Sequence, residues 1–239
     1  MAIRHGRNAG IYVNGVDISG DLNAVSAESE QELADITTFG HIGHSSYPGL
    51  ARDSGTIEAL YNSTEKTVFE GMIQLTPSYA MMLAFGQALG DPAYATEEIM
   101  LKSNSMKSVV TDINKASFSF DVDNYPFEES KLLSTGKQTV AAASTGQGTT
   151  LDNGSASGTT GGAGYLQVFS VTGGTLTISI QTSSTGTFGV ETATTATFSA
   201  ASTSGTERKA VSTQIYRYAR AAWVATGSTC SFALALKRY

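Results

Sequence analysis

Cysteine is nearly absent from this chain of 239 residues, which has Cys230 alone. A single cysteine excludes an internal disulfide framework and a metal cluster held by several cysteines. Cys230 lies in a stretch of alternating apolar residues, and this pattern favours a core position over a reactive thiol.

Long apolar runs are also missing. No stretch approaches the ~18 consecutive apolar residues that a transmembrane helix needs. The opening residues MAIRHGRNAG are basic and interrupted by glycine, without the apolar segment of a secretory signal. We therefore expect no membrane partner and synthesis in the cytoplasm.

Histidine is scarce, and the known catalytic motifs do not occur. His41 and His44 form an HxxH pair, whereas a zinc site needs three or four well-placed ligands. With His5 as the third histidine, a Ser-His-Asp triad would depend on a loop or a terminal arm, and the chain has no GxSxG motif. Phosphate-binding GxxxxGK[ST] and dinucleotide-binding GxGxxG motifs are absent as well. We expect no catalytic residues, no metal, no cofactor and no enzyme activity.

Charge and composition change near residue 136. Residues 1–136 carry 18 acidic and 8 basic side chains, whereas residues 137–239 carry 3 acidic and 7 basic ones, together with 34 serines and threonines. Neither part clusters basic residues with aromatic ones, so tight binding of nucleic acid is disfavoured. We expect two domains, 1–136 and 137–239, the second opening with a linker-like stretch at 137–163.

The first part has the patterns of a β domain. Asn14-Gly15 between apolar triplets predicts a hairpin, because a type I′ turn needs positive φ at both central residues. Residues 1–10 have no pattern and are expected to form an arm. Strands are predicted at 56–61 and 113–123, and the apolar spacing around 64–75 predicts one short helix. The expected fold is a β-sandwich or half-barrel with one short helix.

The second part alternates apolar and polar residues between recurring turns. Leu176, Ile178 and Ile180 are predicted to form one inner face, and a second inner face is predicted for residues 230–236. This pattern is typical of a β-sandwich, so the fold class expected for the whole chain is mainly β.

Residues 36–56 show no period of 2 or 3.6 and contain four glycines and a Tyr47-Pro48-Gly49 turn signal. They predict a long loop, and long loops in compact domains usually bind something. Our hypothesis is that this loop is an arm between subunits.

Acidic residues alternate along two predicted strands. Glu28, Glu30 and Glu32 share one face of the first, and Asp121 and Asp123 share the polar face of the second. Two interpretations stay open for them: a solvated strand face, or an acidic wall that lines something in an assembled state.

A cluster of basic and aromatic residues occurs near the end of the chain. Arg217 and Arg220 lie close to Tyr218 and Trp223. These four residues form either a surface for a glycan or protein partner, or an ordinary solvated strand face.

Several segments together resemble the major tail (tail tube) proteins of long, non-contractile-tailed bacteriophages. They are the opening hairpin at 11–26, the stretch at 34–61, and the Ser/Thr-rich segments at 151–188 and 216–238. The resemblance implies hexameric rings that stack into a tube, an inner β-barrel, one outer helix, and an appended C-terminal β-sandwich. It also implies an inter-ring stacking loop that comprises Thr37, Thr38, Phe39, Gly40, His41, His44, Tyr47, Pro48, Gly49 and Leu50.

The function that the resemblance implies is that of a structural virion protein of the phage tail, made in the host cytoplasm. Its expected partners are other copies of itself, other phage tail proteins, genomic DNA that passes without tight binding, and host-surface glycans. The alternative is a capsid decoration protein or a carbohydrate-binding adhesion β-sandwich.

Overall fold

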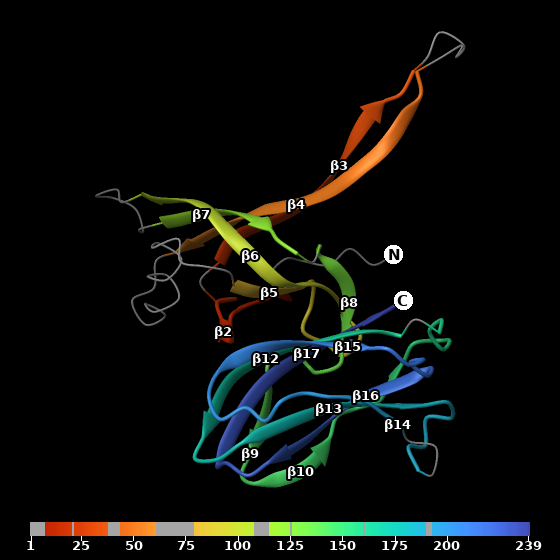
Figure 1. Ribbon diagram of the computed structural model, residues 1–239. Helices are drawn as coiled ribbons and strands as arrows, with labels where there is room; N and C mark the ends of the chain where they lie inside the picture. The colour runs from red at the N-terminus through yellow and green to blue at the C-terminus, as the bar shows by residue number, and fades with distance from the viewer. Residues whose placement is uncertain are drawn as a thin grey trace. The chain divides into compact units, whose positions relative to one another are not determined.

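The computed structural model describes residues 8–20, 22–37, 44–60, 79–107, 115–124, 126–159, 161–189 and 193–239 (Figure 1). This part of the chain is almost entirely β, and its paired strands run antiparallel, as the sequence predicted. It forms two compact units. Unit 1 comprises Met1–Gly20, Tyr79–Glu97 and Glu128–Tyr239, and unit 2 comprises Asp21–Ser78 and Glu98–Phe127.

The strands range from 2 to 16 residues in length. In chain order they are β1 (Gly10–Val13), β2 (Val16–Asp17), β3 (Leu22–Asp35), β4 (Ser46–Leu60), β5 (Tyr79–Ala84), β6 (Pro92–Lys107), β7 (Lys115–Val122), β8 (Glu128–Leu132), β9 (Gln138–Ala141), β10 (Ser144–Gln147), β11 (Leu151–Asp152), β12 (Gly162–Thr172), β13 (Leu176–Ser183), β14 (Ala193–Thr197), β15 (Gly205–Val211), β16 (Tyr218–Ala225) and β17 (Thr229–Arg238). No helix among the described residues is long and apolar enough to cross a membrane.

The predicted Asn14-Gly15 hairpin is confirmed as the β1–β2 turn in unit 1. Asn14 has φ 49° and Gly15 has φ 77°, so both central residues are in the left-handed region that this turn requires. The Gly15 N–H donates a hydrogen bond of 2.7 Å to Oε1 of Gln167 on β12. The turn is thereby fixed to a strand 152 residues away in the sequence.

Unit 1 is built around a sandwich of two sheets. The first has the strand order β15-β12-β17-β8-β6-β5-β1-β2, with β9 also paired to β17, and the second has the order β10-β16-β13-β14, with β11 paired to β16. The two inner faces predicted from alternation are confirmed, because their side chains share one buried core: Leu176, Ile178 and Ile180 from β13, and Cys230, Phe232, Leu234 and Leu236 from β17.

A second core in unit 1 joins residues from both ends of the chain. Tyr12, Met82 and Leu132 pack with Tyr165 and Ala235, and β17 pairs with β8 as well as with β9 and β12. The compositional boundary at residue 136 therefore falls inside unit 1. The stretch predicted as linker-like, 137–163, contains the short strands β9, β10 and β11.

Unit 2 contains the antiparallel strands β3, β4 and β7 and the part of β6 that follows Glu97. Its apolar side chains occupy one face, where Ile57, Ile99, Phe118 and Phe120 are almost fully buried. The strand predicted at 113–123 is thus confirmed as β7. The opposite face is polar, with hydrogen bonds between hydroxyl groups of neighbouring strands, such as Ser26–Thr56 at 2.8 Å and Ser103–Ser119 at 2.6 Å.

The prediction of a loop throughout residues 36–56 is wrong for Ser46–Thr56, which belong to β4. Side chains of β4 from Ser46 to Arg52 are exposed, so no alternation between apolar and polar residues marks this part of the strand. Residues 38–43, residues 1–7 of the arm predicted at 1–10, and the helix predicted at 64–75 lie outside the described residues. The arm prediction is wrong for Gly10, which begins β1.

Candidate assembly surface

The β3–β4 hairpin continues as a two-stranded ribbon beyond the rest of its sheet. Strand β7 pairs with β4 from Ser54 to Leu60, whereas β4 from Ser46 to Asp53 pairs with β3 alone among the described strands. We call residues 29–37 and 44–53 the distal ribbon (Figure 1, the orange hairpin). The predicted stacking loop lies within it, as far as the structure describes that loop.

The distal ribbon exposes large apolar side chains. The exposed fractions are 67% for Leu33, 48% for Ile36, 65% for Tyr47 and 86% for Leu50. A two-stranded ribbon is marginally stable in water by itself, and clustered exposed apolar side chains mark interaction surfaces. The ribbon therefore has the properties of a segment that another surface covers.

These apolar side chains occupy both faces of the ribbon. Leu33 pairs with Pro48, and the next pair along the ribbon joins Ala34 to Tyr47. Successive pairs in an antiparallel ladder point to opposite faces, so Leu33 and Tyr47 lie on different sides. A partner that buries both side chains must contact both faces of the ribbon.

The Tyr47-Pro48-Gly49 segment is a bulged strand, so its prediction as a turn is wrong. Gln31 pairs with Ala51 and Leu33 pairs with Pro48, which places two residues of β4, Gly49 and Leu50, opposite Glu32. An extra residue of this kind bends a strand and redirects its side chains. A proline fits here because the bulge adjoins it and because one edge of β4 is unpaired at this point among the described strands.

Hydrogen bonds connect the last described residues after β3 with the first described residues before β4. The Asp35 carboxylate accepts hydrogen bonds from the Thr37 hydroxyl and from the Thr37 N–H at 2.8 Å, and Nδ1 of His44 lies 3.4 Å from it. Thr37 in turn accepts a hydrogen bond from the Ser45 N–H at 2.9 Å. The bonds from Thr37 are the main cause that lowers the pKa of Asp35.

Of the predicted stacking residues, the structure places Thr37, His44, Tyr47, Pro48, Gly49 and Leu50 in the distal ribbon. Thr38, Phe39, Gly40 and His41 lie outside the described residues. Sequence reasoning missed Leu33, which stands on β3, and placed Ile36 in the predicted loop but not among the stacking residues. The signal for them was a pair of apolar residues beside a run of glutamates.

The predicted acidic face carries bases as well as acids. Glu28 pairs with Ser54, and Ser54 pairs with Asp121, so both acids lie on the polar face of unit 2. Nη2 of Arg52 lies 2.6 Å from Asp121 Oδ2, and Nζ of Lys102 lies 3.6 Å from the same oxygen. The hydrogen bond from Arg52 lowers the pKa of Asp121.

The other predicted acids are exposed. Glu30 pairs with Arg52, Glu32 lies at the bulge, and Asp123 follows the end of β7. The bases that neutralise part of this face come from other strands, which is why the sequence pattern of a single strand did not show them.

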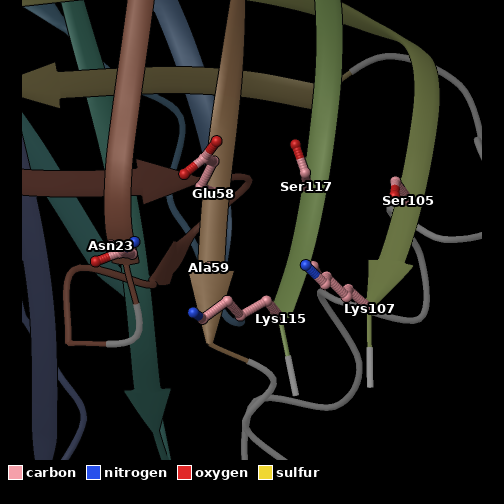
Figure 2. A pocket seen from close by; sticks show the side chains of 8 residues that line it. Asn23, Glu58, Ala59, Ser105, Lys107, Lys115 and Ser117 are labelled. Atoms are coloured by element: carbon pink, nitrogen blue, oxygen red, sulfur yellow. The ribbon is translucent and has the colours of Figure 1, made fainter. Parts of the chain in front are cut away.

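The same polar face is hollowed near the ends of β6 and β7. Figure 2 shows Glu58 and Ser117 together with Lys107 and Lys115 around this hollow. Lys107 pairs directly with Lys115 across the two strands. Two lysines beside the single acid Glu58 make this end of the face locally basic, and like charges in such a pair repel each other.

The structure does not bring the four predicted partner-surface residues together. Trp223 packs against the core of unit 1, with its ring 6.0 Å from that of Phe232. Tyr218 and Arg220 alternate with the buried Ala219 and Ala221 and therefore point to the opposite side of β16.

On that side, two guanidinium groups lie over aromatic rings. The Arg220 guanidinium lies 4.0 Å from the Phe188 ring, and the Arg217 guanidinium lies 4.9 Å from the Tyr218 ring. Sequence reasoning missed Phe188. Contact of this surface with a glycan or protein stays a prediction.

No protein-family model matches the chain, and the comparison with curated proteins gives no match. Solved structures give weak similarities. They include the virion of a native gene transfer agent particle (11% identity, 52% of this chain and 98% of that chain, TM-score 0.43) and the SPP1 tail tube (12% identity, 52% and 78%, TM-score 0.44). The SPP1 Dit protein is similar along 97% of this chain and 99% of its own, with 11% identity and a TM-score of 0.37. Similarities of this size establish neither a family nor a function.

Proposed function

We propose that this chain is a structural subunit of a phage-type tail tube, and that its copies associate through the distal ribbon. The observation that carries the proposal is the exposure of Leu33, Ile36, Tyr47 and Leu50 on a ribbon that extends beyond its sheet. The resemblance of the sequence to major tail proteins supports the same assignment. In this proposal the rings are hexameric, and the ribbon of one ring contacts the next ring.

The edge of unit 2 supports lateral association. Among the described strands, β3 pairs with β4 alone and leaves its other edge open. Open strand edges favour pairing with another chain, and closure into a ring removes them. We assign this edge to the contact between neighbouring subunits of one ring.

The polar face of unit 2 suits the wall of a conduit. It carries hydroxyl groups and charged side chains, and Asp121 pairs with both Arg52 and Lys102. Binding of DNA depends on free lysines and arginines that neutralise phosphates. Because Arg52 and Lys102 are already paired with a carboxylate, this part of the face would let genomic DNA pass toward ejection without tight binding.

Electron microscopy tests this proposal. We expect the purified protein to form rings or filaments of uniform diameter. A Leu33→Asp, Tyr47→Asp double variant should stay monomeric with an unchanged circular dichroism spectrum, because charges on both faces of the ribbon oppose its burial. Val224→Asp is the matched control, since Val224 is 48% exposed and lies on β16 of unit 1, whereas the ribbon belongs to unit 2.

Two outcomes contradict the proposal. One is a wild-type protein that stays strictly monomeric at high concentration. The other is a double variant that assembles as the wild type does, which would remove the ribbon from the contacts between copies.

A further inference from the structure

The polar face of unit 2 is acidic at one end of its sheet and basic at the other. Glu30 and Glu32 lie in the distal ribbon, and alternation along β3 places them on the same face as Glu28. Lys107 and Lys115 lie where β6 ends and β7 begins, and both side chains are exposed (Figure 2).

The register of the strands separates these two groups of charges along one face. Strand β4 begins its pairing with β7 at Ser54, beyond the ribbon, and ends at Leu60 opposite Lys115. Lys115 and Asp121 are an even number of residues apart on β7, so their side chains point to the same face. The ribbon reaches that face too, because Arg52 bonds to Asp121. The ribbon and the two lysines therefore lie at opposite ends of one continuous face.

Each end keeps a net charge among the described residues. The ribbon has three exposed acids, and its one arginine, Arg52, is bonded to Asp121 at 2.6 Å. At the opposite end, Lys107 and Lys115 lie beside one acid, Glu58. Two copies placed end to end therefore bring a negative surface against a positive one.

The apolar face shows a similar correspondence between its two ends. Leu33 follows Glu32 directly on β3, so it points to the apolar face, and it is 67% exposed. Met106 precedes Lys107 on β6, pairs with the buried Ala116 and is 53% exposed. Each end thus exposes a large apolar side chain on one face and charged side chains on the other.

We propose that the lysine end of unit 2 receives the distal ribbon of another copy. The lysine end comprises Met106, Lys107 and Lys115, and its two lysines lie against Glu30 and Glu32 of that copy. This inference rests on the proposed function, because it names the surface that covers the ribbon. Two different surfaces that fit each other associate head to tail, and repetition of this contact builds an open stack.

Charge reversal tests the proposal, with assembly of the full chain followed by sedimentation velocity. Lys107→Glu with Lys115→Glu should raise the protein concentration at half-assembly by about tenfold or more, because acids then face acids. Lys131→Glu with Lys209→Glu is the control and should leave assembly unchanged. It makes the same change of net charge on β8 and β15 of unit 1.

The reciprocal change identifies the partner of the lysines. Glu30→Lys with Glu32→Lys should impair assembly to a similar extent. All four substitutions in one chain should restore assembly to within about threefold of the wild type, because opposite charges then meet again. A purely structural role of the lysines would give no such rescue.

A milder variant covers the case in which the reversed lysines change the circular dichroism spectrum. Lys107→Gln with Lys115→Gln should weaken assembly about threefold or more through lost charge attraction. Unchanged assembly of a folded lysine variant overturns this inference alone, provided that Leu33→Asp, Tyr47→Asp is monomeric. Impairment without rescue by the four substitutions overturns the pairing of these lysines with these acids. A wild type that does not assemble overturns both this inference and the proposed function.

Discussion

Gly15 is the residue at which backbone geometry constrains unit 1 most directly. It has φ 77°, and a Cβ atom there would lie 2.6 Å from the Val168 carbonyl oxygen and 2.8 Å from the Gly205 nitrogen. Gly15→Ala should therefore lower the free energy of unfolding by about 2–3 kcal/mol through backbone strain and displacement of β12. Urea denaturation measures the change.

Gly20→Ala is the matched control for that prediction, because an added Cβ at Gly20 meets no atom within 4 Å. Its unfolding midpoint should stay close to that of the wild type. Equal midpoints for Gly15→Ala and Gly20→Ala would mean that the turn does not pack against β12 as described.

Asp152 gives a prediction of pH dependence at the residue scale. Both carboxylate oxygens accept hydrogen bonds of 2.7 Å from Arg217, which lowers the pKa of Asp152 to about 2. Because the pKa is depressed on folding, the stabilising contribution of this pair is present above pH 3.8, the ordinary value, and is lost as the pH falls toward 2. Arg217→Gln should return the pKa of Asp152 toward 3.8.

Carboxyl chemical shifts measured by NMR as a function of pH test this expectation. The sequence did not predict an ion pair between Asp152 and Arg217, since 65 positions separate them. A pKa of Asp152 that stays low in Arg217→Gln would assign the shift to the Gly154 N–H, which also donates to Asp152 at 2.7 Å.

At the scale of elements, the sequence predicted the strands that bury one face. The alternation of β7 and β13 and the Asn14-Gly15 turn are confirmed, because burial of every second side chain leaves a period of 2 in the sequence. In β17 the predicted inner face is buried too, but the residues between its members are also buried. The β4 half of the distal ribbon was predicted as loop rather than strand, because its side chains from Ser46 to Arg52 are all exposed. Its bulge also interrupts the period at Gly49 and Leu50.

We predict that strand β8 folds as one unit with the strands after residue 136. Comparing the stability of two fragments, one with β8 and one without it, tests this prediction. Glu128 on β8 accepts hydrogen bonds from the hydroxyls of Tyr165 and Tyr239 and lies 3.3 Å from Arg208 Nη2. A fragment of residues 137–239 loses Glu128 and the buried Leu132 and Leu133. It should be less stable than a fragment of residues 128–239 by about 3 kcal/mol or more.

Urea denaturation of the two fragments gives this difference, and Glu128→Gln in the longer fragment separates the contribution of the carboxylate from that of the strand. Equal stability of the two fragments would support the compositional boundary at residue 136 as a domain boundary.

At the scale of the whole molecule, the sequence indicated the candidate site in part. It identified the region of the ribbon and the glutamates beside it, because these are contiguous in the chain. It did not show that Arg52 and Lys102 lie beside Asp121, since strand pairing brings together three separate segments. It also did not show that Trp223 turns into the core, because that depends on the register of β16 against β13.

The central claim is that copies of this chain associate by covering the distal ribbon. Hydrogen–deuterium exchange of the monomer and of the assembled protein measures this most directly. The account predicts that amides of residues 29–37 and 44–53 gain at least about tenfold protection on assembly, while the outer strand β14 is unchanged. An assembled protein whose ribbon exchanges as fast as that of the monomer would contradict the claim.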